Sequence, residues 1–150
     1  MAERASIRTA VIAVLLGSIW PFVLAELFAF SGSLTVALAQ AVTHLGSAGS
    51  VRLVVRSLNA IVWALALGVM FGIPLGLAAR SYVIAYWFAF VASILITSAA
   101  LALHSGAGLG ILLLEWSFPE TWINVVAVLC FARWAARLRA RRERVRVVAP

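Results

Sequence analysis

The sequence carries little charge and very little acid. It contains no Lys and no Asp, and Asp and Glu together number 5 among 150 residues. Charged residues make up 11% of the chain, whereas soluble domains average about 25%. A soluble domain of this length must still cover its surface with polar groups. The shortage of charge therefore excludes a water-soluble globular protein.

Catalytic and metal-binding patterns are also missing. The single cysteine, Cys130, excludes an internal disulfide. No Gly-rich phosphate loop, H-E-x-x-H motif or Ser elbow occurs. Neither His44 nor His104 has a Cys, Asp or Glu neighbour at metal-ligand spacing. We therefore predict no enzyme, no metal site and no bound cofactor.

Long apolar stretches dominate what remains. Hydrophobic residues make up 65% of the chain, and its mean hydropathy is +1.09. A helix needs about 20 mostly apolar residues to cross the hydrocarbon core. Four stretches meet this requirement, over residues of about 7–30, 57–79, 83–103 and 117–136. The sequence predicts an all-α polytopic membrane protein in which residues 1–150 form a single membrane domain.

Two further apolar segments are too short to span. Residues 34–45 place apolar side chains on one helical face and polar ones on the other, which predicts an interfacial amphipathic helix. Residues 106–116 are rich in Gly and then aliphatic, which predicts a membrane-dipping loop. One long span over 107–132 is the alternative. It would bury Glu115 and Glu120 at roughly 3 kcal/mol each near the bilayer centre, so we prefer the loop.

Arginine placement predicts the orientation. Arg4, Arg8 and Arg80 fall at one end of the four predicted spans, together with the arginine-rich tail over 137–150. Basic residues near span ends favour the cytoplasm. We expect a multi-pass protein of the cell (inner) membrane with both termini cytoplasmic. Arg52 and Arg56 are the exception, because they fall on the outer side.

A cleaved secretory signal is an alternative for the N-terminal region. A basic start, an apolar core and a small-residue site after Ala39 are features of such a signal. The apolar core is long for a signal peptide, so we interpret it as an uncleaved first helix.

Small residues recur at every fourth position of the second predicted span. They are Ala60, Ala64, Gly68, Gly72 and Gly76. This spacing keeps them on one face of a helix, where small side chains allow a neighbouring backbone to approach closely. We expect the row to pack against another helix of the same chain, ahead of a homo-oligomer seam. Pro74 should disturb this helix by freeing the carbonyl of Met70.

Three charged residues lie close to the predicted outer face. Glu26 falls near the outer end of the first span, and Arg52 and Arg56 share one helical face before the second. An ion pair between Glu26 and either arginine is the simplest interpretation. The functional alternative makes Glu26 a proton- or cation-binding carboxylate.

The C-terminal tail is predicted to be a basic helix. Its arginines at 137, 139, 141, 142, 144 and 146 should lie along lipid headgroups and hold the topology. Anionic lipid could add roughly 1 kcal/mol for each Arg near the surface. Nucleic acid would use the same charges, but we prefer lipid. The lipid-facing candidates are Arg137, Arg139, Arg141, Arg142, Arg144 and Arg146.

Two local patterns resemble known families. Ala25 and Glu26 in the first of four helices, with the stretch Ile73–Gly76, resemble the small multidrug resistance transporters. That resemblance implies a membrane-embedded glutamate, but this chain lacks their Gly-rich C-terminal dimerisation helix. Ala100 and His104 are similar to the small residue before histidine in light-harvesting polypeptides, which would imply pigment ligation.

These observations favour a non-catalytic membrane protein that serves as an accessory or structural subunit of a larger membrane complex. Its partners would be the lipid bilayer and other membrane subunits, in a hetero-complex or a homo-oligomer. The alternative is a small oligomeric transporter or channel with Glu26 as its proton or cation coupling site. A membrane-toxin or immunity role is also compatible with the sequence.

Overall fold

The chain is helical throughout the part that the structure describes, and the predicted all-α class is confirmed. The structure is a computed structural model that describes residues 7–42, 48–79, 82–106, 108 and 110–148. In chain order the elements are α1 (Ile7–Val42), α2 (Ala48–Leu67), the π-helical turn η2 (Gly68–Gly72), α3 (Ile73–Ala79), α4 (Val83–His104), α5 (Gly110–Ser117) and α6 (Pro119–Val148).

Four helical stretches are long and apolar enough to cross a membrane, as the sequence predicts. They cover Ile7–Leu27, Gly49–Ala79, Val83–His104 and Pro119–Arg144. The second begins earlier than expected because Arg52 and Arg56 already belong to α2. The fourth extends further because the arginine-rich tail continues α6 without a break.

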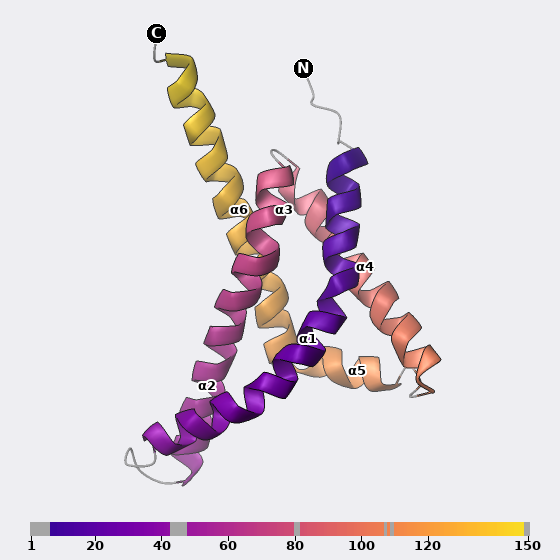
Figure 1. The fold of residues 1–150 in the computed structure, drawn as a ribbon, viewed down its shortest axis with the longest axis vertical. Coiled ribbons are helices and arrows are strands. Elements are labelled where there is room, and N and C mark those ends of the chain that lie inside the picture. The colour runs from indigo at the N-terminus through magenta and orange to yellow at the C-terminus, as the bar shows by residue number, and fades with distance from the viewer. Residues whose placement is uncertain (1–6, 43–47, 80–81, 107, 109, 149–150) are drawn as a thin grey trace.

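The predicted interfacial helix over 34–45 is not confirmed as a separate element. Residues 34–42 continue α1, and residues 43–45 fall outside the described part. Gly32 costs a helix only about 1 kcal/mol relative to Ala, and one such residue does not end a helix of 36 residues. Figure 1 shows α1 changing direction along its length, so that its second half approaches the start of α2.

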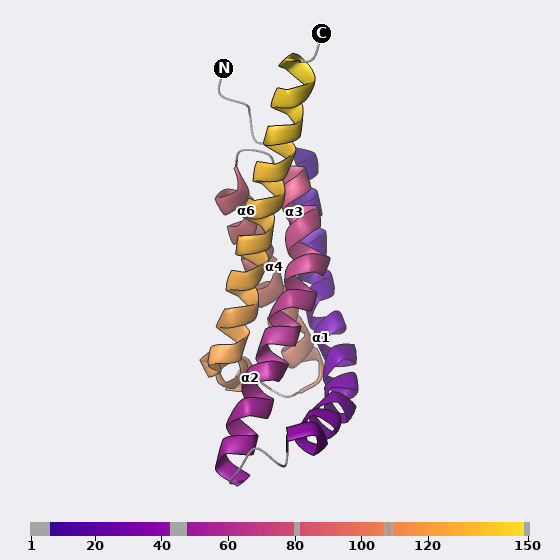
Figure 2. The ribbon, with the colours of Figure 1, turned by 90° about the vertical axis from the view of Figure 1, so that its left-hand side faces the viewer.

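Pro74 coincides with an irregularity in the second span. Because proline has no N–H, it cannot bond to the carbonyl of Met70 four residues earlier. The π-helical turn η2 ends at Gly72, two residues before Pro74, and α3 begins at Ile73. A π turn is a recognised way to absorb a missing bond inside an α-helix. The helix axis therefore continues from α2 through α3, as Figure 2 shows.

The segment before the fourth span forms a short helix of its own. α5 ends at Ser117, a bend follows at Phe118, and α6 begins at Pro119. Proline suits the first turn of a helix because its missing N–H would have no partner there. The single long span over 107–132 does not occur, because the direction of the chain changes between α5 and α6 (Figure 1).

The helices associate as two pairs. α1 packs along α4, while α2, η2 and α3 pack along α6. Figures 1 and 2 show that α2 and α6 run in the same direction. α1 begins and α6 ends at one end of the molecule. The starts of α2 and α6 lie at the opposite end.

An aromatic cluster joins the two pairs at the centre. The rings of Trp20, Phe71 and Phe90 come from α1, η2 and α4, with centroids 5.0, 5.6 and 5.9 Å apart. All three side chains are buried. Many large apolar side chains elsewhere on the spans are exposed, which is the arrangement expected of helices that face lipid.

Candidate functional site

Glu26 lies on α1 near the end of the first candidate span, and it is exposed. The ion pairs seen among the described residues join Arg56 to Glu120 and Arg139 to Glu143. Neither includes Glu26 or Arg52, although both are described and exposed. The expected ion pair between Glu26 and one of the two arginines is therefore wrong.

Arg56 instead forms an ion pair with Glu120, its Nε donating to Glu120 Oε1. The reason is the packing of α2 beside α6. Arg56 stands four residues before Ala60, so it extends the small-residue row of α2 by one turn. Glu120 lies in the first turn of α6, the helix that this row contacts. The two charges thus meet at the end of the helix pair.

Two asparagines lie one helical turn beyond this ion pair in the sequence. Asn59 and Asn124 lie three and four residues beyond Arg56 and Glu120, respectively, on the same helical faces. Their Oδ1 atoms are buried and have no hydrogen-bond partner within the described part of the chain. Amide side chains in membrane helices suit hydrogen bonding to a neighbouring helix.

The small-residue row lies against α6. Gly68, Gly72 and Gly76 are buried, and Ala60 and Ala64 are half-buried. A Cβ added at Gly72 would lie 2.6 Å from the carbonyl oxygen of Val128, and one at Gly68 would collide with the ring of Phe131. Only hydrogen fits at these positions, so the glycines set how closely η2 and α3 approach α6.

Polar side chains of α1 and α4 also serve packing, both within their own pair and against the other pair. Ser93 of α4 donates to the carbonyl of Val14 at 2.8 Å and lies 2.9 Å from the hydroxyl of Ser18. Thr9 donates to the carbonyl of Ala78 at 3.1 Å. Trp87 donates to the carbonyl of Val125 at the same distance. Each bond joins two different helices.

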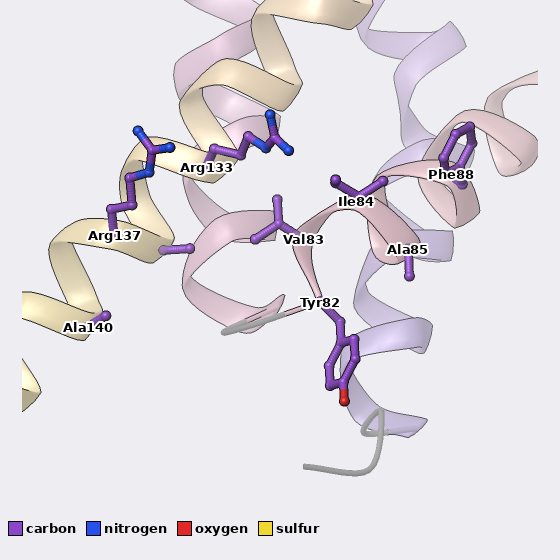
Figure 3. Close-up of a pocket in the computed structure, with 9 residues that line it drawn as sticks. Tyr82, Val83, Ile84, Ala85, Phe88, Arg133, Arg137 and Ala140 are labelled. Atoms are coloured by element: carbon purple, nitrogen blue, oxygen red, sulfur yellow. The ribbon is translucent and has the colours of Figure 1, made fainter. Parts of the chain in front are cut away.

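An open groove of about 760 Å³ lies between the start of α4 and α6. Figure 3 shows Arg133 and Arg137 extending from α6, with Arg133 reaching towards the first turns of α4. The other walls are apolar apart from the Tyr82 hydroxyl. The lining residues are Tyr82, Val83, Ile84, Ala85, Phe88, Arg133, Ala136, Arg137 and Ala140. Sequence reasoning missed Arg133 as a site residue, although its four-residue spacing from Arg137 places both on one face.

The predicted headgroup arginines do not behave alike. Arg139 is half-buried, pairs with Glu143 at 2.9 Å and donates through its Nη1 to the carbonyl of Leu77. Arg137 lines the groove. Arg141, Arg142 and Arg144 are exposed, while the side chain of Arg146 falls outside the described set. Only some of these arginines are thus free to face lipid.

The remaining candidates do not assemble into a site within the described residues. His104 is exposed at the end of α4, and His44 falls outside the described part. Cys130 is exposed. No group of three or more His, Cys, Asp or Glu side chains comes together among the described residues.

Comparisons with protein-family models, with curated proteins and with solved structures find no match to this chain.

Proposed function

We propose that this protein is a non-catalytic subunit of a larger membrane complex, held there in part through Glu26. The supporting observation is the exposure of Glu26 at the end of a membrane-spanning stretch, with no ion-pair partner among the described residues. A charged side chain at the bilayer centre costs roughly 3 kcal/mol on insertion scales, and less towards the interface. A partner that brings an Arg, a Lys or a hydrogen-bond donor to this depth would offset that cost.

The other polar side chains support a structural role over a transport role. Ser18, Ser93, Thr9 and Trp87 make hydrogen bonds that join helices. A proton or cation pathway would need polar groups that converge around Glu26, and the ion pairs of the described residues do not include this carboxylate. The experiment below therefore also tests whether the protein is a transporter.

Glu26→Gln is expected to release the partner without weakening the fold. The protein would be purified from native membranes in mild detergent, and the proteins that accompany it would be compared with those of the wild type. Because Glu26 forms no ion pair within the described chain, its thermal unfolding temperature should stay the same. Glu120→Gln is the matched control. It removes the Arg56 pair, so it should lower the unfolding temperature and keep the partner.

Two results would contradict the proposal. Glu26→Gln could retain every partner, which would remove the basis for the subunit role. Alternatively, the purified wild-type protein could catalyse a proton-coupled flux in liposomes that Glu26→Gln abolishes. In that case the protein is a transporter.

We also propose that both ends of the chain face the cytoplasm of the cell (inner) membrane. This orientation follows the arginines at 133–146 and at the ends of the first three spans. In a Cys130→Ala background, Gly49→Cys should react only with a membrane-impermeant maleimide added outside. Arg144→Cys should react only after the membrane is opened. Labelling of both positions from one side would overturn the even number of spans.

A further inference from the structure

The groove in Figure 3 has one apolar wall and one basic wall. One wall is apolar and exposed, formed by Ile84 and Phe88 of α4. The opposite wall carries the guanidinium groups of Arg133 and Arg137. No acidic residue lines the groove. Its chemistry is therefore complementary to a molecule that has an anionic group and an aliphatic chain.

Arg133 and Arg137 lack a counter-charge within the described structure. Neither takes part in the ion pairs of that part of the chain, where Glu143 is bound to Arg139 and Glu120 to Arg56. Helical side chains lean towards the N-terminal end of their helix. Both guanidinium groups accordingly extend away from Ala140 and back along the span, as Figure 3 shows. They do not reach out along the tail into water.

The depth of the groove explains why a counter-charge is needed. Arg133 belongs to the fourth candidate span, and it faces the first turns of α4, where the third span begins. A positive charge at this boundary is partly removed from water. Lipid phosphate groups lie at the boundary of the hydrocarbon core, so a lipid headgroup is the counter-charge expected where a span begins. Guanidinium binds phosphate through two parallel N–H···O bonds, which makes Arg the preferred partner.

We propose that the groove binds one anionic phospholipid of the surrounding bilayer. Its phosphodiester lies between Arg133 and Arg137, and one acyl chain follows Ile84 and Phe88. The volume of about 760 Å³ falls within the range of roughly 300–1,000 Å³ typical of small-molecule sites. The proposal differs from general attraction to the basic tail because it requires two particular arginines. It does not depend on the subunit role.

The test measures lipid retention by native mass spectrometry of the full-length protein in mild detergent. Phosphatidylglycerol and phosphatidylcholine with identical acyl chains are offered in equal amounts. The wild type should retain one phosphatidylglycerol in preference to phosphatidylcholine. R133Q combined with R137Q should lower that retention at least tenfold. R141Q combined with R144Q removes the same charge from exposed positions outside the groove, and should leave retention unchanged.

Two further measurements distinguish the proposal from a folding defect and from simple anion binding. If the groove double variant does not fold, Ala140→Glu keeps both arginines and places a carboxylate three residues from Arg137. It should also lower phosphatidylglycerol retention. Inorganic phosphate at millimolar concentration should not displace the lipid. Equal losses in the groove and tail variants would overturn the proposal, as would displacement by phosphate or equal retention of both lipids.

Discussion

Gly76→Ala is expected to be among the most destabilising single substitutions in this chain. A Cβ at this position would lie 2.7 Å from the carbonyl carbon of Ala132 and 2.8 Å from its Cα. Both are backbone atoms of α6, which cannot rotate aside as a side chain can. α3 and α6 must therefore move apart. Overpacking commonly lowers the free energy of unfolding by 1–3 kcal/mol, and we expect a loss of about 3 kcal/mol.

Gly32→Ala provides the matched control, because Gly32 also lies inside a helix and its added Cβ would meet no atom within 4 Å. Alanine favours the helix over glycine by about 1 kcal/mol, so this variant should be as stable as the wild type or slightly more so. Unfolding in detergent can be followed by the fluorescence of the six tryptophans. Equal stability of the two variants would mean that the glycine row does not contact α6.

Phe90→Ala is expected to produce a loss of similar size for a different reason. Phe90 is 0% exposed and contacts the rings of Trp20 and Phe71. Truncation leaves a cavity between α1, η2 and α4, and the surrounding rings lose their packing partners. Buried Phe→Ala substitutions lower the free energy of unfolding by about 3–5 kcal/mol. We expect the lower end, because detergent also solvates apolar groups.

Phe22→Ala is the comparison for this second variant. Phe22 is 56% exposed on α1, so its removal takes little contact away and should change the free energy of unfolding by less than about 0.5 kcal/mol. The same fluorescence measurement serves both. A loss for Phe22→Ala as large as for Phe90→Ala would place the packed face of α1 on the other side of the helix.

The spans could be predicted from the sequence because the bilayer imposes a length. Inside the bilayer every backbone group must form its hydrogen bonds within the protein, so an apolar stretch of about 20 residues can adopt few structures other than a helix. Helix boundaries were harder to predict. The sequence predicted a first span ending near residue 30 and a separate interfacial helix from residue 34, yet α1 continues to Val42. The cost of a single glycine, about 1 kcal/mol, is outweighed by the rest of a 36-residue helix.

Which helices pack against one another could not be predicted. The periodicity of small residues shows which face of a helix is packed, but not which helix packs against that face. The row from Ala60 to Gly76 indicated a packed face, and the structure places that face on α6. If α6 had been known to be the neighbour of α2, the same four-residue spacing would have paired Arg56 with Glu120. The sequence does not show this neighbour, so the ion pair was assigned to Glu26, which the predicted topology placed near Arg52 and Arg56. Asn59 and Asn124 were missed for the same reason.

The pairing of α3 with α6 also sets an order of events during synthesis. Ala132 is made 56 residues after Gly76. At roughly 5–20 residues per second, this separation corresponds to roughly three to eleven seconds. α1 is complete before that interval and α4 is completed halfway through it, so the two can associate through the contacts of Ser93 with Val14 and Ser18. The glycine face of η2 and α3 has no partner from its own chain until α6 is made. The last helix to leave the ribosome is thus the one that closes the bundle.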